Sequence, residues 1–454
     1  MNNAAPAYTL GFVQSMLTEQ SGRASGWFKD MEIKTVFQPA FSLPHKKAVG
    51  FAASLRGASE DGSVVAPEEM LGPADNFSET CLLDLLGTTI HVHNFASSRS
   101  GGNLLFLNLH SEVFLDYAHS GPFLAALFEH YRITRHRVVL AIPAYLLKLE
   151  RLDSAIEAYR ALGCLISIDD LGVENADLDS VVRTAPDIVK IDHSLVASAV
   201  ANESVRKTLL HAVSLLHEMG TLVLLEGIES KAEALMAIET DADFANGFYF
   251  GPLCENVDEF DEPGGVLDNL WNSYKEKRGR GHAREAMFRD SLDEETLHSL
   301  YIKKLRSTSP AEIHRYRDER RPFIAAIQQA GGLMEDGHGF EAACTGFLKL
   351  DGAIRCFLLG GDGRQIGPDL PGALSPKPQS MDISGLIEPG DGDWSRRDYF
   401  RRAMQEPELV QVTRRYRSLD GYVHCVTFSI AVTVNGQPVV ICGDVDWSKH
   451  ANIQ

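Results

Sequence analysis

The chain has 454 residues, of which 44% are hydrophobic and 23% charged, and its net charge is -19. This length exceeds the roughly 250 to 300 residues at which a single core stops growing, so at least two domains are expected. The acidic balance excludes broad binding to nucleic acid, which requires a basic face. No apolar run approaches the roughly 18 residues that span a bilayer, and no membrane insertion is expected.

The amino-terminal segment, residues 1–33, lacks the basic region and long apolar stretch of an export signal, so a cytoplasmic protein is expected. Seven cysteines are scattered along the chain without a C-x-x-C pair. This pattern favours reduced, buried thiols over a disulfide framework or a zinc site.

Residues 34–255 alternate short β-rich runs with longer helical stretches such as Leu209 to Met219. Apolar runs of this length, separated by amphipathic segments, are typical of buried parallel strands with crossover helices. The pattern predicts an α/β fold with a TIM-like (β/α) barrel. The predicted strands are Val36–Ser42, Leu104–Leu109, Val138–Ile142, Leu165–Ile168, Ile188–Ile191, Leu222–Leu225 and Phe244–Phe250.

Polar residues stand at or just after the carboxyl ends of these runs. In a barrel of this kind, sites are built on that face from the ends of several strands. We therefore expect a site there, formed by Asn108, Asp169, Asp170, Lys190, Asp192 and Glu226.

Residues 256–330 are expected to form a helical linker. The basic stretch 275–284 (KEKRGRGHAR) indicates a linker or an exposed helix end, and helices are predicted at 297–305 and 313–329. The second helix follows Ser309-Pro310-Ala311-Glu312, which has the form of a capping box.

Residues 331–454 are predicted to form an α+β domain with an antiparallel sheet. The expected strands are 354–359, 410–418, 422–432 and 438–445, with a helix at 396–404. Hairpin signals stand at Asp351-Gly352, Asp420-Gly421 and Asn435-Gly436.

Three fragments of the first half lie on a common frame: Gln38-Pro39 with residues 50–56 (GFAASLR), residues 168–172 (IDDLG), and residues 226–229 (EGIE). They resemble the EAL family of cyclic-di-GMP phosphodiesterases, whose motifs read Q-P, G-Y-E-A-L-x-R, D-D-F-G and E-G-V-E. The resemblance covers residues 34–253. It implies a two-metal site, of which Asn108, Asp169, Asp170 and Glu226 are the matching remnant.

Several family residues are replaced in this chain. Ala52 and Ala141 stand where the family has metal-binding glutamates, and Ala144 replaces the glutamate that holds the loop after the aspartate pair. That loop, residues 173–177, also departs from the family pattern. Because alanine offers no electron pair to a metal, we predict no catalytic residues and no cofactor; magnesium or manganese would matter only if hydrolysis persists.

The resemblance also implies a nucleotide site. Gln38, Arg56, Phe250 and Pro252 match family positions that contact cyclic-di-GMP, and Arg56, expected at a strand end, offers a planar donor fork to a phosphate. The full expected ligand set adds Asp169, Asp170, Lys190, Glu226 and Asn246, the last of which replaces a family glutamine.

The order Trp394-x-Arg396-Arg397-x-Tyr399-Phe400, followed by strands ending in residues 443–446, is similar to PAS-like sensor domains of the Cache type. The alternative is a packing or dimerisation domain without a ligand.

Three functions follow from these observations. The first is a degenerate EAL receptor that binds cyclic-di-GMP without cleaving it, and the second is a scaffold for an unidentified protein partner. The third is residual hydrolysis through one metal on Asn108, Asp169 and Glu226. A homodimer is compatible with each, since symmetric dimers are the commonest oligomers.

Overall fold

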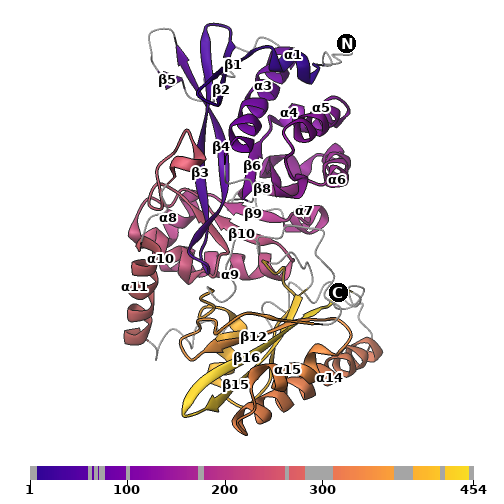
Figure 1. Ribbon diagram of the computed structural model, residues 1–454, viewed down its shortest axis with the longest axis vertical. Coiled ribbons are helices and arrows are strands. Elements are labelled where there is room, and N and C mark those ends of the chain that lie inside the picture. The colour runs from indigo at the N-terminus through magenta and orange to yellow at the C-terminus, as the bar shows by residue number, and fades with distance from the viewer. Residues whose placement is uncertain are drawn as a thin grey trace. The chain divides into compact units, whose positions relative to one another are not determined.

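The computed structural model describes residues 8–59, 64–65, 70, 77–98, 103–171, 178–260, 265–281, 310–372, 392–419 and 425–448. They form two compact units, one made of most of residues 1–267 and the other of most of residues 268–454 (Figure 1). Within the described ranges, no helix has both the length and the apolar character needed to cross a bilayer.

The first unit contains an eight-stranded barrel, which confirms the predicted TIM-like α/β fold. Strands β4, β6, β7, β8, β9, β10 and β11 pair in parallel in that order. β3 closes the barrel by pairing with β4 and β11. The barrel strands are β3 (Met31–Ser42), β4 (Lys47–Ser59), β6 (Leu104–Asn108), β7 (Val138–Pro143), β8 (Leu165–Leu171), β9 (Ile188–Ile191), β10 (Leu222–Leu225) and β11 (Phe244–Asn246).

The expectation of an entirely parallel barrel was wrong for β3, which is antiparallel to both of its neighbours. Only residues 43–46 join β3 to β4. A connection of this length makes a hairpin, whereas a parallel pair needs a crossover of a dozen or more residues. β4 was also absent from the predicted strands.

The last barrel strand is shorter than predicted: β11 ends at Asn246 rather than at Phe250. The next residue, Gly247, has φ +145, and a Cβ at this position would lie 2.2 Å from the backbone of Ile228. The chain therefore turns where only glycine fits.

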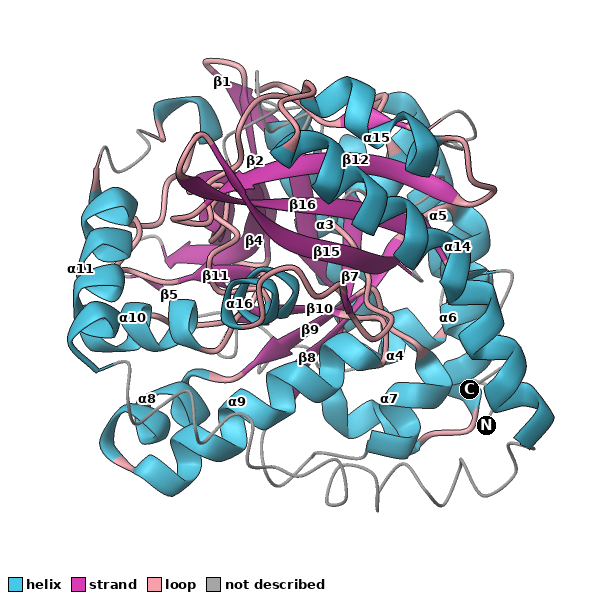
Figure 2. Cartoon of the chain, turned by 90° about the horizontal axis from the view of Figure 1, so that it is seen from below, coloured by secondary structure: helices cyan, strands magenta, loops and turns pink. Residues whose placement is uncertain are grey.

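Helices cover the outside of the barrel (Figure 2). In α9, Leu209, Val213 and Leu216 recur at helical spacing and are buried, as the amphipathic pattern predicted. A capping box between Ser230 and Glu233 begins α10. The helices are α3 (Phe77–Ala96), α4 (Ser111–Leu115), α5 (Tyr117–His130), α6 (Arg151–Leu162), α7 (Leu178–Thr184), α8 (His193–Ala201), α9 (Glu203–Glu218) and α10 (Lys231–Glu239).

Short elements extend the β3–β4 hairpin beyond the barrel. After α1 (Leu10–Gln14), β1 (Leu17–Gln20) pairs with β2 (Arg23–Phe28), which pairs with the start of β3; β5 (Val64–Val65) pairs with the end of β4. The expected domain boundary at residue 34 thus falls within β3. We call the long antiparallel pair of β3 and β4 the β3–β4 ribbon.

The second unit contains a five-stranded antiparallel sheet in the order β13-β12-β16-β15-β14. Its strands are β12 (Ala353–Gly360), β13 (Leu370–Pro371), β14 (Gln411–Val412), β15 (Cys425–Val434) and β16 (Gln437–Asp446). The unit also contains most of α11 (Val266–Gly281) together with α14 (Pro310–Glu335), α15 (Phe340–Leu348) and α16 (Asp398–Gln405). An α+β unit with an antiparallel sheet is therefore confirmed.

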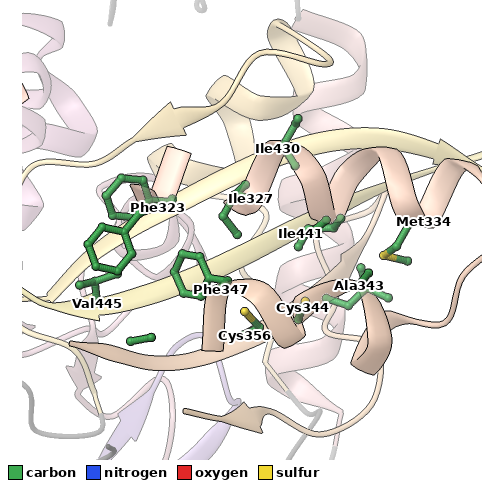
Figure 3. Close-up of a cluster of buried hydrophobic side chains, with 14 of the residues drawn as sticks. Phe323, Ile327, Met334, Ala343, Cys344, Phe347, Cys356, Ile430, Ile441 and Val445 are labelled. Carbon is green, nitrogen blue, oxygen red and sulfur yellow. The ribbon is translucent and has the colours of Figure 1, made fainter. Parts of the chain in front are cut away.

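Aromatic and aliphatic side chains of α14, α15 and one sheet face form the main core of this unit (Figure 3). Phe323 stacks on Phe428 with ring centroids 5.3 Å apart and also contacts Phe347 and Trp447. A smaller cluster on the other face joins Phe357 to Tyr399 and Phe400 of α16.

Other local predictions had mixed outcomes. Asn435-Gly436 joins β15 to β16, and both residues have positive φ, as expected for a two-residue hairpin turn. The strand predicted at 410–418 is limited to Gln411–Val412, and Asp351-Gly352 joins a helix to a strand. The helices predicted at 313–329 and 396–404 are present as α14 and α16. The first residues of the basic stretch 275–284 form the end of α11, as far as Gly281. Asp420-Gly421 and the helix predicted at 297–305 lie outside the described residues.

Replacing Gly443 by Ala is expected to destabilise the second unit. A Cβ at Gly443 of β16 would lie 2.4 Å from the ring of Phe347, which is fully buried. Overpacking of this kind costs about 1 to 3 kcal/mol, measurable by chemical denaturation. The matched control is Gly346→Ala in α15, where nothing lies within 4 Å and a higher helix propensity predicts unchanged or increased stability. Equal stability of the two variants would contradict this view of the core.

Candidate functional site

The strand register brings a set of side chains together at the carboxyl ends of the parallel strands. Directly paired residues share a face of a sheet, and alternate residues of one strand do the same. Gln38 pairs with Ala52, Ala52 with Phe106, and Asn108 with Ala141. On the next four strands of the barrel, Asp169, Lys190 and Asn246 lie near the carboxyl ends of β8, β9 and β11, and Glu226 directly follows β10.

The centre of this site is the ammonium group of Lys190, which is 2% exposed. Its Nζ donates to Asp169 Oδ2 at 2.6 Å and lies 3.5 Å from Glu226 Oε1. The Phe106 ring lies on another side, with its centroid 5.5 Å from Nζ, within the range of a cation–π interaction. The lysine is therefore held by two carboxylates and one aromatic face.

Neighbouring polar groups fix the two carboxylates. Ser167 donates its hydroxyl proton to Asp169 Oδ1 at 2.9 Å. Asn246 donates from Nδ2 to Glu226 Oε1 at 3.5 Å, and its Oδ1 accepts from the Gly227 amide at 3.1 Å. The asparagine thus ties the end of β11 to the turn that follows β10.

Electrostatics keep the lysine charged. Burial by itself lowers the pKa of Lys190, but the Asp169 and Glu226 carboxylates outweigh it and raise the pKa above its ordinary value. Burial raises the pKa of Glu226, an effect that the Lys190 charge opposes. Burial, together with the charges of Asp169 and Asp192, also raises the pKa of Asp170. These carboxylates crowd one another, and Lys190 is the cation that stabilises them.

The structure separates some of the other predicted residues from this centre. Asp170 is exposed and has φ 56, at the point where the β8–β9 register shifts, so its side chain does not join Asp169 at Lys190. Asn108 is the exposed last residue of β6, and Pro252 is exposed after β11.

Two expectations need correction. Phe250 is 1% exposed and packs on Phe41 with ring centroids 5.5 Å apart, so its side chain lies in the core rather than on an open surface. Arg56 lies within β4, three residues before its end, rather than at a strand end. Because β4 runs on past the barrel, Arg56 is two residues, or about 7 Å, beyond the level of Asn108.

Phe106 and Ser167 belong to the site but were not among the predicted residues. Each stands two positions before a predicted residue on the same strand, Asn108 and Asp169 respectively. The two-residue period of a strand places such neighbours on one face. This period was the signal available in the sequence, but it applies to every strand residue and so did not single out Phe106 or Ser167.

Two of the three alanines that replace family glutamates lie on this face, Ala52 through its pairing with Phe106 and Ala141 through its pairing with Asn108. Ala52 and Ala141 have only methyl groups to present, and Ala141 is 3% exposed. Ala144, also 3% exposed, begins a single turn at Ala144–Lys148. Residues 173–177, the altered loop after the aspartate pair, lie outside the described residues.

These features define a (β/α) barrel with one antiparallel strand and a carboxylate-lined site at the carboxyl ends of its parallel strands. The chain belongs to the EAL domain family, whose family model matches residues 22–252.

Relatives share this region. The EAL-domain containing protein YkuI from Bacillus subtilis (strain 168) is 28% identical over 228 residues, which are 48% of this chain and 54% of YkuI. The biofilm architecture maintenance protein MbaA of Vibrio cholerae serotype O1 is 24% identical over 227 residues, 49% of this chain and 28% of MbaA. The matches thus span about half or less of these relatives. A crystal structure of YkuI in complex with cyclic-di-GMP and calcium aligns with a TM-score of 0.49 and 17% identity, over 92% of this chain and 96% of that one.

A buried acid supports the loop that follows Asn108. Asp84 of α3 accepts from the His110 amide through Oδ1 at 3.1 Å. Its Oδ2 is buried and has no hydrogen-bond partner among the described residues. Burial raises the pKa of Asp84 to about 7, although the bond from His110 opposes the shift.

Asp84 predicts a pH-dependent stability. Between its ordinary pKa of 3.8 and about 7, the folded protein retains a proton that the unfolded chain has released, so stability falls as pH rises through this window. Relative to Asp84→Asn, the wild type should lose on the order of 2 kcal/mol of unfolding free energy between pH 5 and pH 8. Denaturant titrations at several pH values measure this, with the exposed Asp30→Asn as control. Parallel pH profiles for wild type and Asp84→Asn would contradict it.

Proposed function

We propose that the barrel is a receptor for cyclic-di-GMP that binds its ligand without a divalent cation and does not hydrolyse it. Membership of the EAL family supports the ligand class. The observation that carries the proposal is the ion-paired Lys190, whose ammonium lies between Asp169 and Glu226, the carboxylates that a metal would need.

The donor set does not fit a two-metal centre. Two-metal hydrolysis requires cations that activate water and stabilise the attacking and leaving oxygens. Ala52 and Ala141 supply no donors, the exposed Asp170 side chain makes no ion pair with Lys190 among the described residues, and Asp169 already accepts from both Ser167 and Lys190. Among the described residues no group of three His, Cys, Asp or Glu side chains has an arrangement suited to a metal ion.

A receptor of this kind must offset the negative charges of both the ligand and the site. The ligand carries two phosphates, and Asp169, Asp170 and Glu226 add negative charge to the site. Lys190 offsets part of it. The guanidinium of Arg56 donates from Nη1 to the Leu55 carbonyl oxygen at 2.7 Å and forms no ion pair within the described residues, so its remaining N–H groups are available to a phosphate. Charge-assisted bonds to a planar guanidinium are well suited to this contact.

The second unit is, in this proposal, a PAS/Cache-like sensor module. Its five-stranded antiparallel sheet with helices on both faces supports this. So does a buried polar centre on the α16 face, where Arg355 donates to Asp444 at 2.9 Å and to Asp369 at 2.8 Å. A packing or dimerisation role without a ligand is the competing function.

Isothermal titration with cyclic-di-GMP tests the receptor proposal. We expect binding in the presence of a chelator, with no gain on adding magnesium, and no linear product after prolonged incubation with magnesium or manganese. Product that accumulates in proportion to protein, and survives repeated purification, would establish residual hydrolysis. Absence of binding under both conditions would favour a scaffold for a protein partner.

The variant Arg56→Ala should weaken binding by about 1.5 to 3 kcal/mol, the range for a hydrogen bond to a charged group. Circular dichroism should remain native, because Arg56 is only partly buried on the ribbon. The control is Arg23→Ala on β2, whose exposed guanidinium pairs with Glu255 at 3.1 Å and should leave affinity unchanged. Equal affinity of the two variants would remove Arg56 from the ligand site.

A further inference from the structure

The β3–β4 ribbon places a second basic residue beside Arg56. Lys34 is the direct cross-strand partner of Arg56, and four residues further along, Gln38 is the partner of Ala52. Residues in direct register point to the same face, and positions 34 and 38 share that face because they are an even number of residues apart. Lys34 therefore lies on the same side of the ribbon as Gln38 and Arg56, the face that leads to the site.

Lys34 has a weakly held partner in the structure. Its Nζ lies 2.9 Å from Glu32 Oε2, and the two side chains are 44% and 28% exposed. The hydrogen bond from Lys34 lowers the pKa of Glu32. Exposed pairs of this kind contribute about 0 to 1 kcal/mol, so an anionic ligand can displace Glu32 at little cost.

The charges of the proposed site indicate why a second cation matters. Asp169, Asp170 and Glu226 bring three negative charges, whereas Lys190 and Arg56 bring two positive ones. Without a divalent metal, a ligand with two phosphates meets a site that is negative overall. Lys34, next to Arg56, is a third cation, but in the free protein Glu32 neutralises it, so its charge reaches the ligand only when the phosphate replaces Glu32.

We infer that Lys34 is an affinity-determining residue that acts with Arg56 to hold a phosphate of the ligand, while Glu32 competes for it in the free protein. This inference rests on the proposed cyclic-di-GMP receptor function. The ligand site then includes the part of the β3–β4 ribbon that extends beyond the barrel, in addition to the strand ends.

The test compares cyclic-di-GMP affinities in chelator at low and high salt. Lys34→Ala should weaken binding about three- to tenfold at low salt and less at high salt, because the contact is partly exposed. Lys34→Arg should retain affinity, and Glu32→Gln should tighten binding by removing the competitor. The control is Lys207→Ala on α9, which has the same 44% exposure and a glutamate 4.0 Å away, and should change nothing.

The outcomes separate this inference from the proposed function. If wild type binds and Arg56→Ala weakens binding while Lys34→Ala matches Lys207→Ala, the role of Lys34 is overturned and the receptor function stands. If Glu32→Gln weakens binding, the competition is overturned. If wild type does not bind cyclic-di-GMP, both proposals fail together. Circular dichroism and a denaturation midpoint for each variant exclude unfolding as the cause.

Discussion

The buried ion pairs of Lys190 allow two carboxylates to lie close together at the carboxyl ends of the barrel strands. Three strands bring Asp169, Lys190 and Glu226 to one point, and two carboxylates with no cation there would carry a large desolvation cost. The ammonium lies within 2.6 Å of one and 3.5 Å of the other, with the Phe106 ring at its side. A charge supplied by the chain itself thus stabilises these two carboxylates.

Barrel closure and the proposed ligand site depend on the same hairpin. β3 completes the barrel because a four-residue connection forces it to run antiparallel to β4, and it then pairs with β11 on its other edge. The two strands are longer than the other barrel strands, so their pairing continues past the rim and positions the basic side chains of Lys34 and Arg56 there.

The second unit separates its apolar and polar interactions between the two faces of one sheet. The α14–α15 face is an apolar core around Phe323 and Phe428. The α16 face contains Asp444, which is 1% exposed and accepts from Thr427 at 2.7 Å as well as from Arg355. A buried, satisfied charge network is directional, whereas apolar packing is not, so this face is the one suited to specifying a unique arrangement.

The amino-acid sequence by itself determined the barrel, the antiparallel second unit and the strand-end positions of Asp169, Lys190 and Glu226. These follow from local periodicity and from residues that stand directly after apolar runs. Only the tertiary structure decided that β3 is antiparallel, that Phe250 lies in the core and Arg56 within a strand, and that Phe106, Ser167 and Lys34 face the site. Each of these depends on strand register and on side-chain packing between segments distant in the chain, which local sequence patterns do not encode.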